Sequence, residues 1–146
     1  LRNVPAERLR MHICWGNYPG PHHHDVPIAD ILDLLLGIRA GALLFEGANS
    51  RHAHEWKVWE NVKLPDGMVI VPGVIESMSN RIEHPELIAE RIVRYAQMVG
   101  RENVIAGSDC GFGTFVGLDL VDAGIAWAKM RSLAEGARLA SASLWK

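Results

Sequence analysis

Residues 67–76, GMVIVPGVIE, form an almost continuous apolar run that closes with a glutamate. Because polar and apolar residues hardly alternate in it, the run is typical of a parallel strand covered on both faces. Three further segments have the same character: RMHICW at 10–15, GALLFEG at 41–47 and NVIAGSDC at 103–110. The sequence therefore predicts four buried strands.

Helical segments separate these strands. Apolar residues recur at helical spacing over 26–38, with Asp25 as the expected N-cap and Pro27 in the first turn. Further helices are expected at 50–60, 85–99 and 118–144, the last of them either one long helix or two helices broken near Gly136. Four strand–helix units indicate an α/β fold with a parallel sheet in a single domain, 1–146. Both a doubly wound sheet and half of a (β/α)8 barrel satisfy this order.

Composition narrows the function classes. The net charge is −2 and acids and bases are interspersed, so nothing favours binding to nucleic acid or to an anionic membrane. No apolar run is long enough to cross a bilayer. With only two cysteines, we expect a cytoplasmic protein with reduced thiols rather than a Cys14–Cys110 disulfide. The loop-like first nine residues lead us to expect a fragment or the product of a truncated gene.

Metal-competent side chains gather where the predicted strands end. His12 and Cys14 are two residues apart, so they face the same side of one strand. Glu46 closes the second strand and Cys110 closes the fourth. The carboxyl ends of parallel strands meet at one edge of a sheet, so we expect these four side chains to lie close together. Their nitrogen, sulfur and oxygen donors are those of a tetrahedral zinc site.

Two further acids lie at the same edge and are candidate catalytic residues. Glu76 closes the third strand, where it would act as an acid–base group in a cleft or cap the next loop. Asp109 precedes Cys110, and it would react or would orient a neighbouring loop. Taken singly, His12 is typical of a core histidine, and each cysteine of a small buried hydrophobe.

For each of the other polar residues near these strand ends, the sequence allows two roles. Arg51 pairs either with an anionic group of the substrate or with Glu55. His52 and His54 are expected on the surface where a helix starts, with contact to the substrate as the alternative. Three consecutive histidines at 22–24, on a loop rich in proline and glycine, do not easily converge on one ion. We expect them to cover the substrate or to be solvated.

Four motifs carry a resemblance to a known family. HIC at 12–14, LLFEGANSR at 43–51, GSDCGF at 107–112 and VPGVIESMSN at 71–80 resemble segments of cobalamin-independent methionine synthases. The resemblance covers essentially the whole chain, but only the second half of that family's C-terminal (β/α)8 barrel. It implies that His12, Cys14, Glu46 and Cys110 bind zinc.

The resemblance also implies an activity. It indicates zinc-dependent methyl or alkyl transfer to a thiol such as homocysteine, as in 5-methyltetrahydropteroyltriglutamate–homocysteine methyltransferase. The coenzyme M epoxide transferases belong to the same wider group. Met78 stands where the family has a histidine that protonates the leaving group of the methyl donor, and Glu76 replaces the preceding aspartate. The identity of the alkyl donor is therefore open.

The expected chemistry follows from the charge of the donor set. A thiol with a pKa of about 8.5 is only slightly ionised at neutral pH, and zinc deprotonates it. Two thiolates and one carboxylate leave the site net negative, which keeps a bound sulfur nucleophilic. Glu46 is the ligand we expect to be displaced, because oxygen is the weakest match for zinc among these donors.

Two alternatives to an active enzyme remain open from the sequence. The chain is either a non-catalytic zinc-binding half-barrel or a module that assembles with a separate N-terminal half. Four strand–helix units leave two sheet edges and one sheet face uncovered. We therefore expect a homo-oligomer. Either a two-fold dimer closes an eight-stranded barrel, or the chain stacks its bare sheet face on that of a partner.

Overall fold

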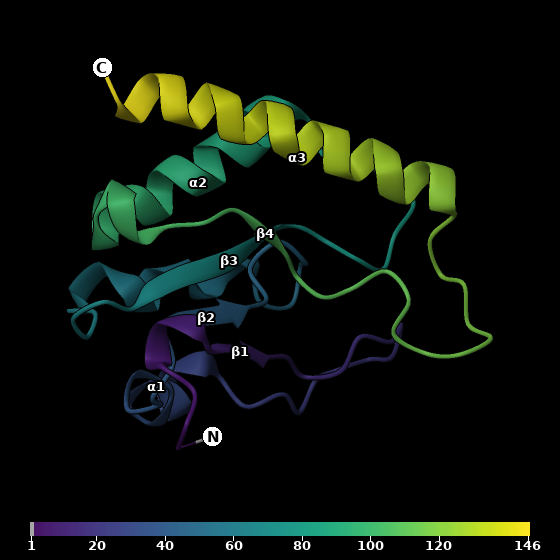
Figure 1. The fold of residues 1–146 in the computed structure, drawn as a ribbon. Coiled ribbons are helices and arrows are strands. Elements are labelled where there is room, and N and C mark those ends of the chain that lie inside the picture. The colour runs from purple at the N-terminus through teal and green to yellow at the C-terminus, as the bar shows by residue number, and fades with distance from the viewer. Residues whose placement is uncertain (1) are drawn as a thin grey trace.

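A computed structural model describes residues 2–146, which form a four-stranded parallel sheet with helices (Figure 1). The strands follow one another in chain order and are β1 (Arg10–Ile13), β2 (Ala42–Phe45), β3 (Val69–Ile75) and β4 (Gly107–Ser108). The predicted α/β class and parallel sheet are confirmed. The fourth strand is much shorter than predicted, because its pairing with β3 shifts register between Gly73 and Ile75.

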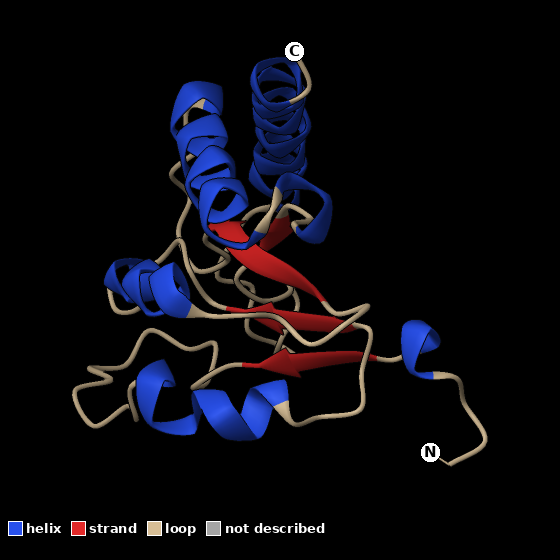
Figure 2. Cartoon of the chain, turned by 90° about the vertical axis from the view of Figure 1, so that its left-hand side faces the viewer, coloured by secondary structure: helices blue, strands red, loops and turns tan. Residues whose placement is uncertain are grey.

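The helices form an arc around the sheet (Figure 2). They are α1 (Ile28–Leu36), α2 (Pro85–Val99) and α3 (Ala123–Leu144), with 3-10 helices η1 (Ala6–Arg8), η2 (Ala53–Asn61) and η3 (Arg101–Asn103). One core cluster packs strand residues against α1, η2 and α2: Ile28, Leu35, Leu43, Phe45, Trp59, Ile70 and Tyr95. A second packs β3 against α2 and α3: Val74, Ile75, Ile88, Ile92 and Ala140. No helix within 2–146 is long and apolar enough to cross a membrane.

The last helix is continuous over Ala123–Leu144, so of the two alternatives the break near Gly136 is wrong. Gly136 lies inside α3 and is buried against α2. A Cβ atom at this position would lie 2.6 Å from Cβ of Ile88 and 2.8 Å from the carbonyl oxygen of Pro85. The glycine therefore allows the two helices to approach closely. It does not end a helix.

The start of α1 also differs from the prediction. The helix begins at Ile28, and the Asp25 side chain does not cap it. Instead the backbone N–H of Ile28 donates to Oε1 of Glu55, at 2.8 Å. Glu55 lies in η2, where an α-helix was predicted from residue 50. A distant carboxylate thus stabilises the helix terminus, which frees Asp25 for other partners.

One side of the sheet is open near β1, although Val71 of β3 on the same side is buried. In the strand register, His12 lies opposite Leu44, which lies opposite Val71. Alternation turns Leu43 and Phe45, which belong to the core cluster, to the other side. His12 and Cys14 are exposed, and Leu44 is only half-buried. The metal-competent side of β1 is therefore the uncovered side.

This open side generates a prediction about assembly. Among the described residues β1 and β4 are edge strands with one neighbour each. Such edges and an uncovered sheet face favour association with another chain, so we expect a homo-oligomer at micromolar concentration. Light scattering measures the mass, and a stable monomer would contradict the expectation. Leu44→Arg should lower the mass, whereas Leu34→Arg, on the exposed face of α1, should leave it unchanged.

Candidate metal centre

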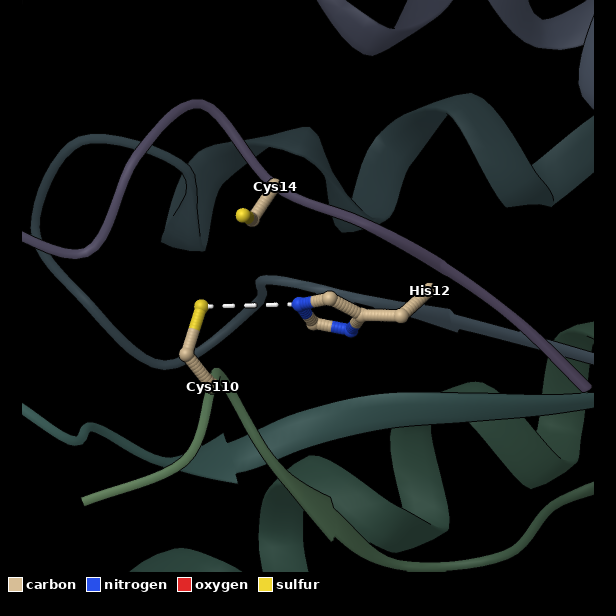
Figure 3. Close-up of side chains that lie close together, drawn as sticks. All are labelled: His12, Cys14 and Cys110. Carbon is tan, nitrogen blue, oxygen red and sulfur yellow. Dashed lines mark hydrogen bonds between the residues drawn. The ribbon is translucent and has the colours of Figure 1, made fainter. Parts of the chain in front are cut away.

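Three of the four predicted metal donors meet at the carboxyl edge of the sheet (Figure 3). One donor atom from each of His12, Cys14 and Cys110 lies within 4.8 Å of the other two. Nε2 of His12 and Sγ of Cys110 are 3.6 Å apart. Bond lengths of about 2.0–2.3 Å in a tetrahedral zinc site place donor atoms about 3.3–3.8 Å apart. The chemistry of the three side chains and the distance between His12 and Cys110 therefore fit a zinc ion.

Glu46 lies beside this three-donor cluster. The Cys110 thiol donates to its Oε1 at 3.4 Å, but Glu46 is outside the group whose donor atoms all lie within 4.8 Å of one another. Its side chain is buried, and burial raises the pKa of the Glu46 carboxyl group, with Cys110 and Arg51 opposing that rise. Of the four predicted donors, Glu46 is thus the one that lies outside the three-donor cluster.

The two cysteines differ in environment. Both are free thiols, Cys14 exposed and Cys110 buried. Burial first, then the neighbouring Glu46 carboxylate and Cys14, raise the pKa of the Cys110 thiol. The protein by itself therefore holds Cys110 in the protonated form, and a cation is needed to make it a thiolate.

Asp109 faces away from the cluster and organises the loop after β2. Oδ1 accepts the backbone N–H groups of Gly47 and Ala48, both at 2.8 Å. Oδ2 accepts the backbone N–H and the side-chain amide of Asn49, also at 2.8 Å. Gly73 permits this approach, because a Cβ atom there would lie 2.7 Å from Cα of Asp109. The carboxylate thereby fixes the loop that begins at the Glu46 strand end.

The ionisation of Asp109 follows from its partners. Burial raises the pKa of its carboxyl group, and the N–H groups of Gly47, Ala48 and Asn49 oppose that rise. The four groups that hydrogen-bond to the carboxylate are all N–H donors, from three residues. A protonated carboxyl group would need an acceptor for its own O–H. The geometry therefore suits a carboxylate that holds a loop.

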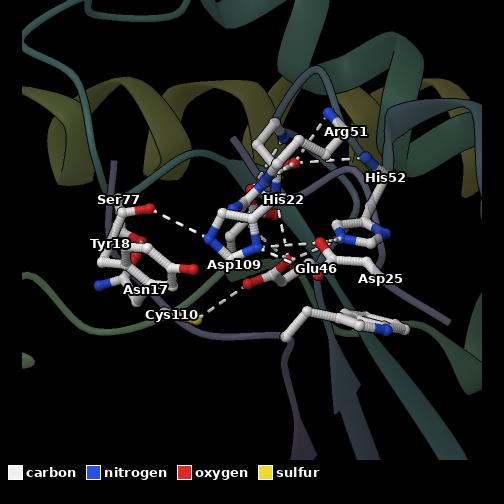
Figure 4. Close-up of polar contacts among 12 residues, drawn as sticks. Asn17, Tyr18, His22, Asp25, Glu46, Arg51, His52, Ser77, Asp109 and Cys110 are labelled. Carbon is white, nitrogen blue, oxygen red and sulfur yellow. Dashed lines mark hydrogen bonds and ion pairs between the residues drawn. The ribbon is translucent and has the colours of Figure 1, made fainter. Parts of the chain in front are cut away.

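His52 lies behind Glu46, and its predicted place on the surface is wrong (Figure 4). The side chain is buried and its ring stacks on Trp15, with centroids 4.1 Å apart. Nδ1 lies 2.9 Å from Oε2 of Glu55, and Nε2 lies 3.3 Å from Asp25 and 3.4 Å from Oε2 of Glu46. Burial lowers the pKa of His52, but these three carboxylates outweigh it and raise the pKa overall.

Arg51 lies on the same side of Glu46. The predicted alternative of a pair with Glu55 is wrong, because His52 binds that carboxylate. Nη2 of Arg51 instead lies 3.6 Å from Oε2 of Glu46. Nε donates to Oδ1 of Asn49 at 3.3 Å. The sequence motif ANSR placed both Asn49 and Arg51 after the glutamate, but nothing in it indicated this arrangement.

Glu76 occupies a separate hollow. Ser79 donates to Oε1 of Glu76, and Nη2 of the exposed Arg81 lies 3.6 Å from the same oxygen. The hollow, of about 470 Å³, is also lined by His84 and Arg91. No hydrogen bond or ion pair that we observe within 2–146 joins Glu76 to the three-donor cluster.

The histidines at 22–24 do not form a metal cluster among the described residues. His22 has a positive φ of 46° and its Nδ1 lies 2.9 Å from Asp25. The rings of His23 and His24 pack on each other.

A second set of polar residues spans the same sheet edge: the buried Ser77 donates to Oδ1 of Asn17. Asn17 in turn donates to the carbonyl oxygen of Gly111, which ties the loops after β1, β3 and β4 together.

Comparison with known proteins adds distant relatives. No family model matches the chain. It is 28% identical to 2-hydroxypropyl-CoM lyase of Xanthobacter autotrophicus over an alignment of 168 positions including gaps, which covers 98% of this chain and 43% of that protein. It is 29% identical to the uncharacterized protein YxjH of Bacillus subtilis over 127 residues, covering 84% of this chain and 32% of that one. The chain therefore spans less than half of either relative.

A solved structure shares the fold. It is a B12-independent methionine synthase from Shewanella sp. W3-18-1 in complex with selenomethionine, matched with a TM-score of 0.74 at 17% identity. The match covers 93% of this chain and 39% of that protein. The four strand–helix units thus have the arrangement of part of a larger barrel-like enzyme.

We predict unequal roles for the metal donors. Loss of a group that hydrogen-bonds to a metal ligand typically lowers metal affinity by roughly 10–100-fold. Cys110→Ala should lower zinc affinity by more than this, because it removes a thiolate ligand, which supplies the strongest bond. Glu46→Gln should cost about 10-fold or less, since a neutral oxygen still coordinates. Competition with a chromophoric chelator measures both affinities. Full zinc stoichiometry in Cys110→Ala under this competition would contradict the assignment.

Asp109→Asn tests the loop-organising role of that residue. The amide would turn a donor toward two of the N–H groups that the carboxylate now accepts, so we expect a loss of about 2–3 kcal/mol in the free energy of unfolding. Urea denaturation of the metal-free chain measures it. Asp119→Asn makes the same chemical change at an exposed loop position and should be neutral. Equal stabilities of the two variants would refute the role.

Proposed function

We propose that the chain carries a zinc-dependent site that transfers a methyl or alkyl group to a substrate thiol. The observation that carries the proposal is the convergence of His12, Cys14 and Cys110, from segments far apart in sequence, within 4.8 Å. Glu46, in contact with Cys110, is the proposed fourth ligand. A donor set rich in sulfur, with one weaker oxygen donor, suits a site whose ligand exchanges.

Two similarities support this class of reaction. One relative is a 2-hydroxypropyl-CoM lyase, named for a thioether of coenzyme M, and the solved structure with the same fold is a B12-independent methionine synthase. Both names point to chemistry at a carbon–sulfur bond. We infer a thiol substrate resembling homocysteine or coenzyme M, and an alkyl donor whose identity is open. Two free cysteines suit a reducing, cytoplasmic setting.

In the proposed reaction, the metal ligands and the substrate groups have separate roles. Zinc, when bound, supplies the positive charge that lets a substrate thiol ionise at neutral pH. His12, Cys14 and Cys110 hold it, and their two thiolates with Glu46 keep the centre net negative. In the transfer, a sulfur–carbon bond forms as the bond from carbon to the leaving group breaks. The leaving group keeps that electron pair and gains the proton that the thiol lost.

Glu76 and Asp109 have different proposed parts. Glu76 lies at the end of β3 in a polar hollow, where a half-buried carboxyl group is suited to exchange a proton with the donor's leaving group. Asp109 acts as a positioning residue, because the hydrogen bonds of its carboxylate that we observe within 2–146 all go to residues 47–49. Met78, half-buried near Glu76, offers no proton of its own.

A second candidate function is zinc binding without transfer. Exposure of His12 and Cys14 on the open side of the sheet favours it, because a reacting centre is normally closed off from water. Completion of the barrel by a second copy or by a separate N-terminal half would supply that closure. The two candidates therefore differ in what the chain does alone.

Product analysis tests the proposed function. Zinc-loaded chain is incubated with homocysteine or 2-mercaptoethanesulfonate and with 5-methyltetrahydrofolate or epoxypropane, alone and with an added N-terminal barrel half. Mass spectrometry should detect the thioether at least about 10-fold faster than with Cys110→Ala, since positioned ionisation of the thiol lowers the barrier. The exposed pair Arg138–Glu135 offers a control, Arg138→Gln, which should keep the full rate. Equal rates in all samples would favour zinc binding without transfer.

A further inference from the structure

The Glu46 carboxylate lies between Cys110 on one side and three nitrogen donors on the other, and none of its contacts with those nitrogen donors is short (Figure 4). Oε1 lies 3.4 Å from Sγ of Cys110. Oε2 lies 3.4 Å from the Asn49 amide, 3.4 Å from Nε2 of His52 and 3.6 Å from Nη2 of Arg51. Hydrogen bonds between an N–H cation and a carboxylate are normally about 2.7–2.9 Å long. A shift of less than about 1 Å away from Cys110 would therefore bring Glu46 into normal contact with Arg51.

The guanidinium group of Arg51 has unused donors. Its side chain is 17% exposed, and Nη1 and Nη2 are both buried and have no hydrogen-bond partner among residues 2–146. Buried N–H groups without an acceptor are costly, and more so when they carry charge. The ion pair that we observe for these two nitrogens within 2–146 is with Glu46. The unused donors thus face the carboxylate that has room to move.

The base of the Arg51 side chain is held in place. Oδ1 of Asn49 accepts both the backbone N–H and Nε of Arg51, at 3.0 and 3.3 Å. The amide of Asn49 donates in turn to Asp109 at 2.8 Å. Arg51 is therefore anchored through Asn49 to the carboxylate that organises the loop, and its free nitrogens cannot swing away without breaking this chain of contacts.

We propose that Arg51 is a positioning residue that receives the Glu46 carboxylate when a substrate sulfur replaces it beside His12, Cys14 and Cys110. The proposal rests on the proposed function, since it concerns the exchange of a ligand for a thiol. A guanidinium group offers two parallel N–H donors that match both oxygens of a carboxylate, which an amide or an ammonium group does not. Arg51 would satisfy its unused donors in the thiol-bound state and would favour that state over the thiol-free one.

The experiment separates thiol binding from zinc binding. Wild type and Arg51→Met are loaded with zinc, and X-ray absorption at the zinc edge counts sulfur and lighter donors while 2-mercaptoethanesulfonate is added. In wild type we expect one more sulfur and one fewer oxygen. In Arg51→Met we expect the thiol concentration for half-conversion to rise at least 10-fold, while zinc affinity without thiol stays within about 3-fold. Arg51→Lys, which keeps the charge, should fall between them.

A second variant makes the test specific to the pair. In the Glu46→Gln variant, residue 46 has no negative charge to pair with the Arg51 guanidinium group. Adding Arg51→Met to this variant should therefore change thiol uptake by less than about 2-fold. The Arg138→Gln control should behave like wild type in every measurement.

The outcomes are distinct. Wild-type chain that gains no sulfur would overturn the proposed function and with it this inference. Unchanged thiol uptake in Arg51→Met would overturn the inference and leave the function standing. A 10-fold loss of zinc affinity in Arg51→Met without thiol would assign Arg51 to support of the metal site and would also overturn the inference.

Discussion

The carboxylate of Asp109 accepts four N–H groups from residues 47–49, and the candidate site depends on this interaction. It joins the end of β4, which carries Cys110, to the loop that follows Glu46 at the end of β2. Because β4 has only two residues in regular pairing, its own ladder does little to fix the cysteine. A buried, fully hydrogen-bonded carboxylate supplies the rigidity that the short strand lacks. The distance between Cys110 and Glu46 follows from it.

The site is divided into an exposed half and a buried half. His12 and Cys14 stand on the open side of β1, whereas Cys110 and Glu46 are buried among charged partners. Burial keeps Cys110 protonated in the absence of a cation, which links occupation of the site to loss of that proton. The exposed half is the part of the site that solvent reaches. The proposed metal site is therefore open to solvent on one side and enclosed by the protein on the other.

A set of buried, charged side chains contacts Oε2 of Glu46, on the opposite side of the carboxylate from Cys110. His52 touches Asp25, Glu55 and Glu46, and Glu55 also caps α1 through the N–H of Ile28. A single carboxylate thus couples the start of a helix to the environment of a metal donor. Alternation and spacing in the sequence cannot indicate such contacts, because they join loops that approach only after the sheet has formed. This is why His52 was predicted on the surface and Asp25 as a cap.

The sequence by itself determined the four parallel strands, their order of alternation with helices, and the donors His12, Cys14 and Cys110 at one edge. Apolar runs and a two-residue spacing encode these features locally, and parallel topology brings strand ends together. Only the tertiary structure decided that α3 is unbroken at Gly136, that Arg51 faces Glu46, and that Asp109 binds a loop. These depend on side-chain contacts between segments distant along the chain, where burial and unmet hydrogen bonds select the partner.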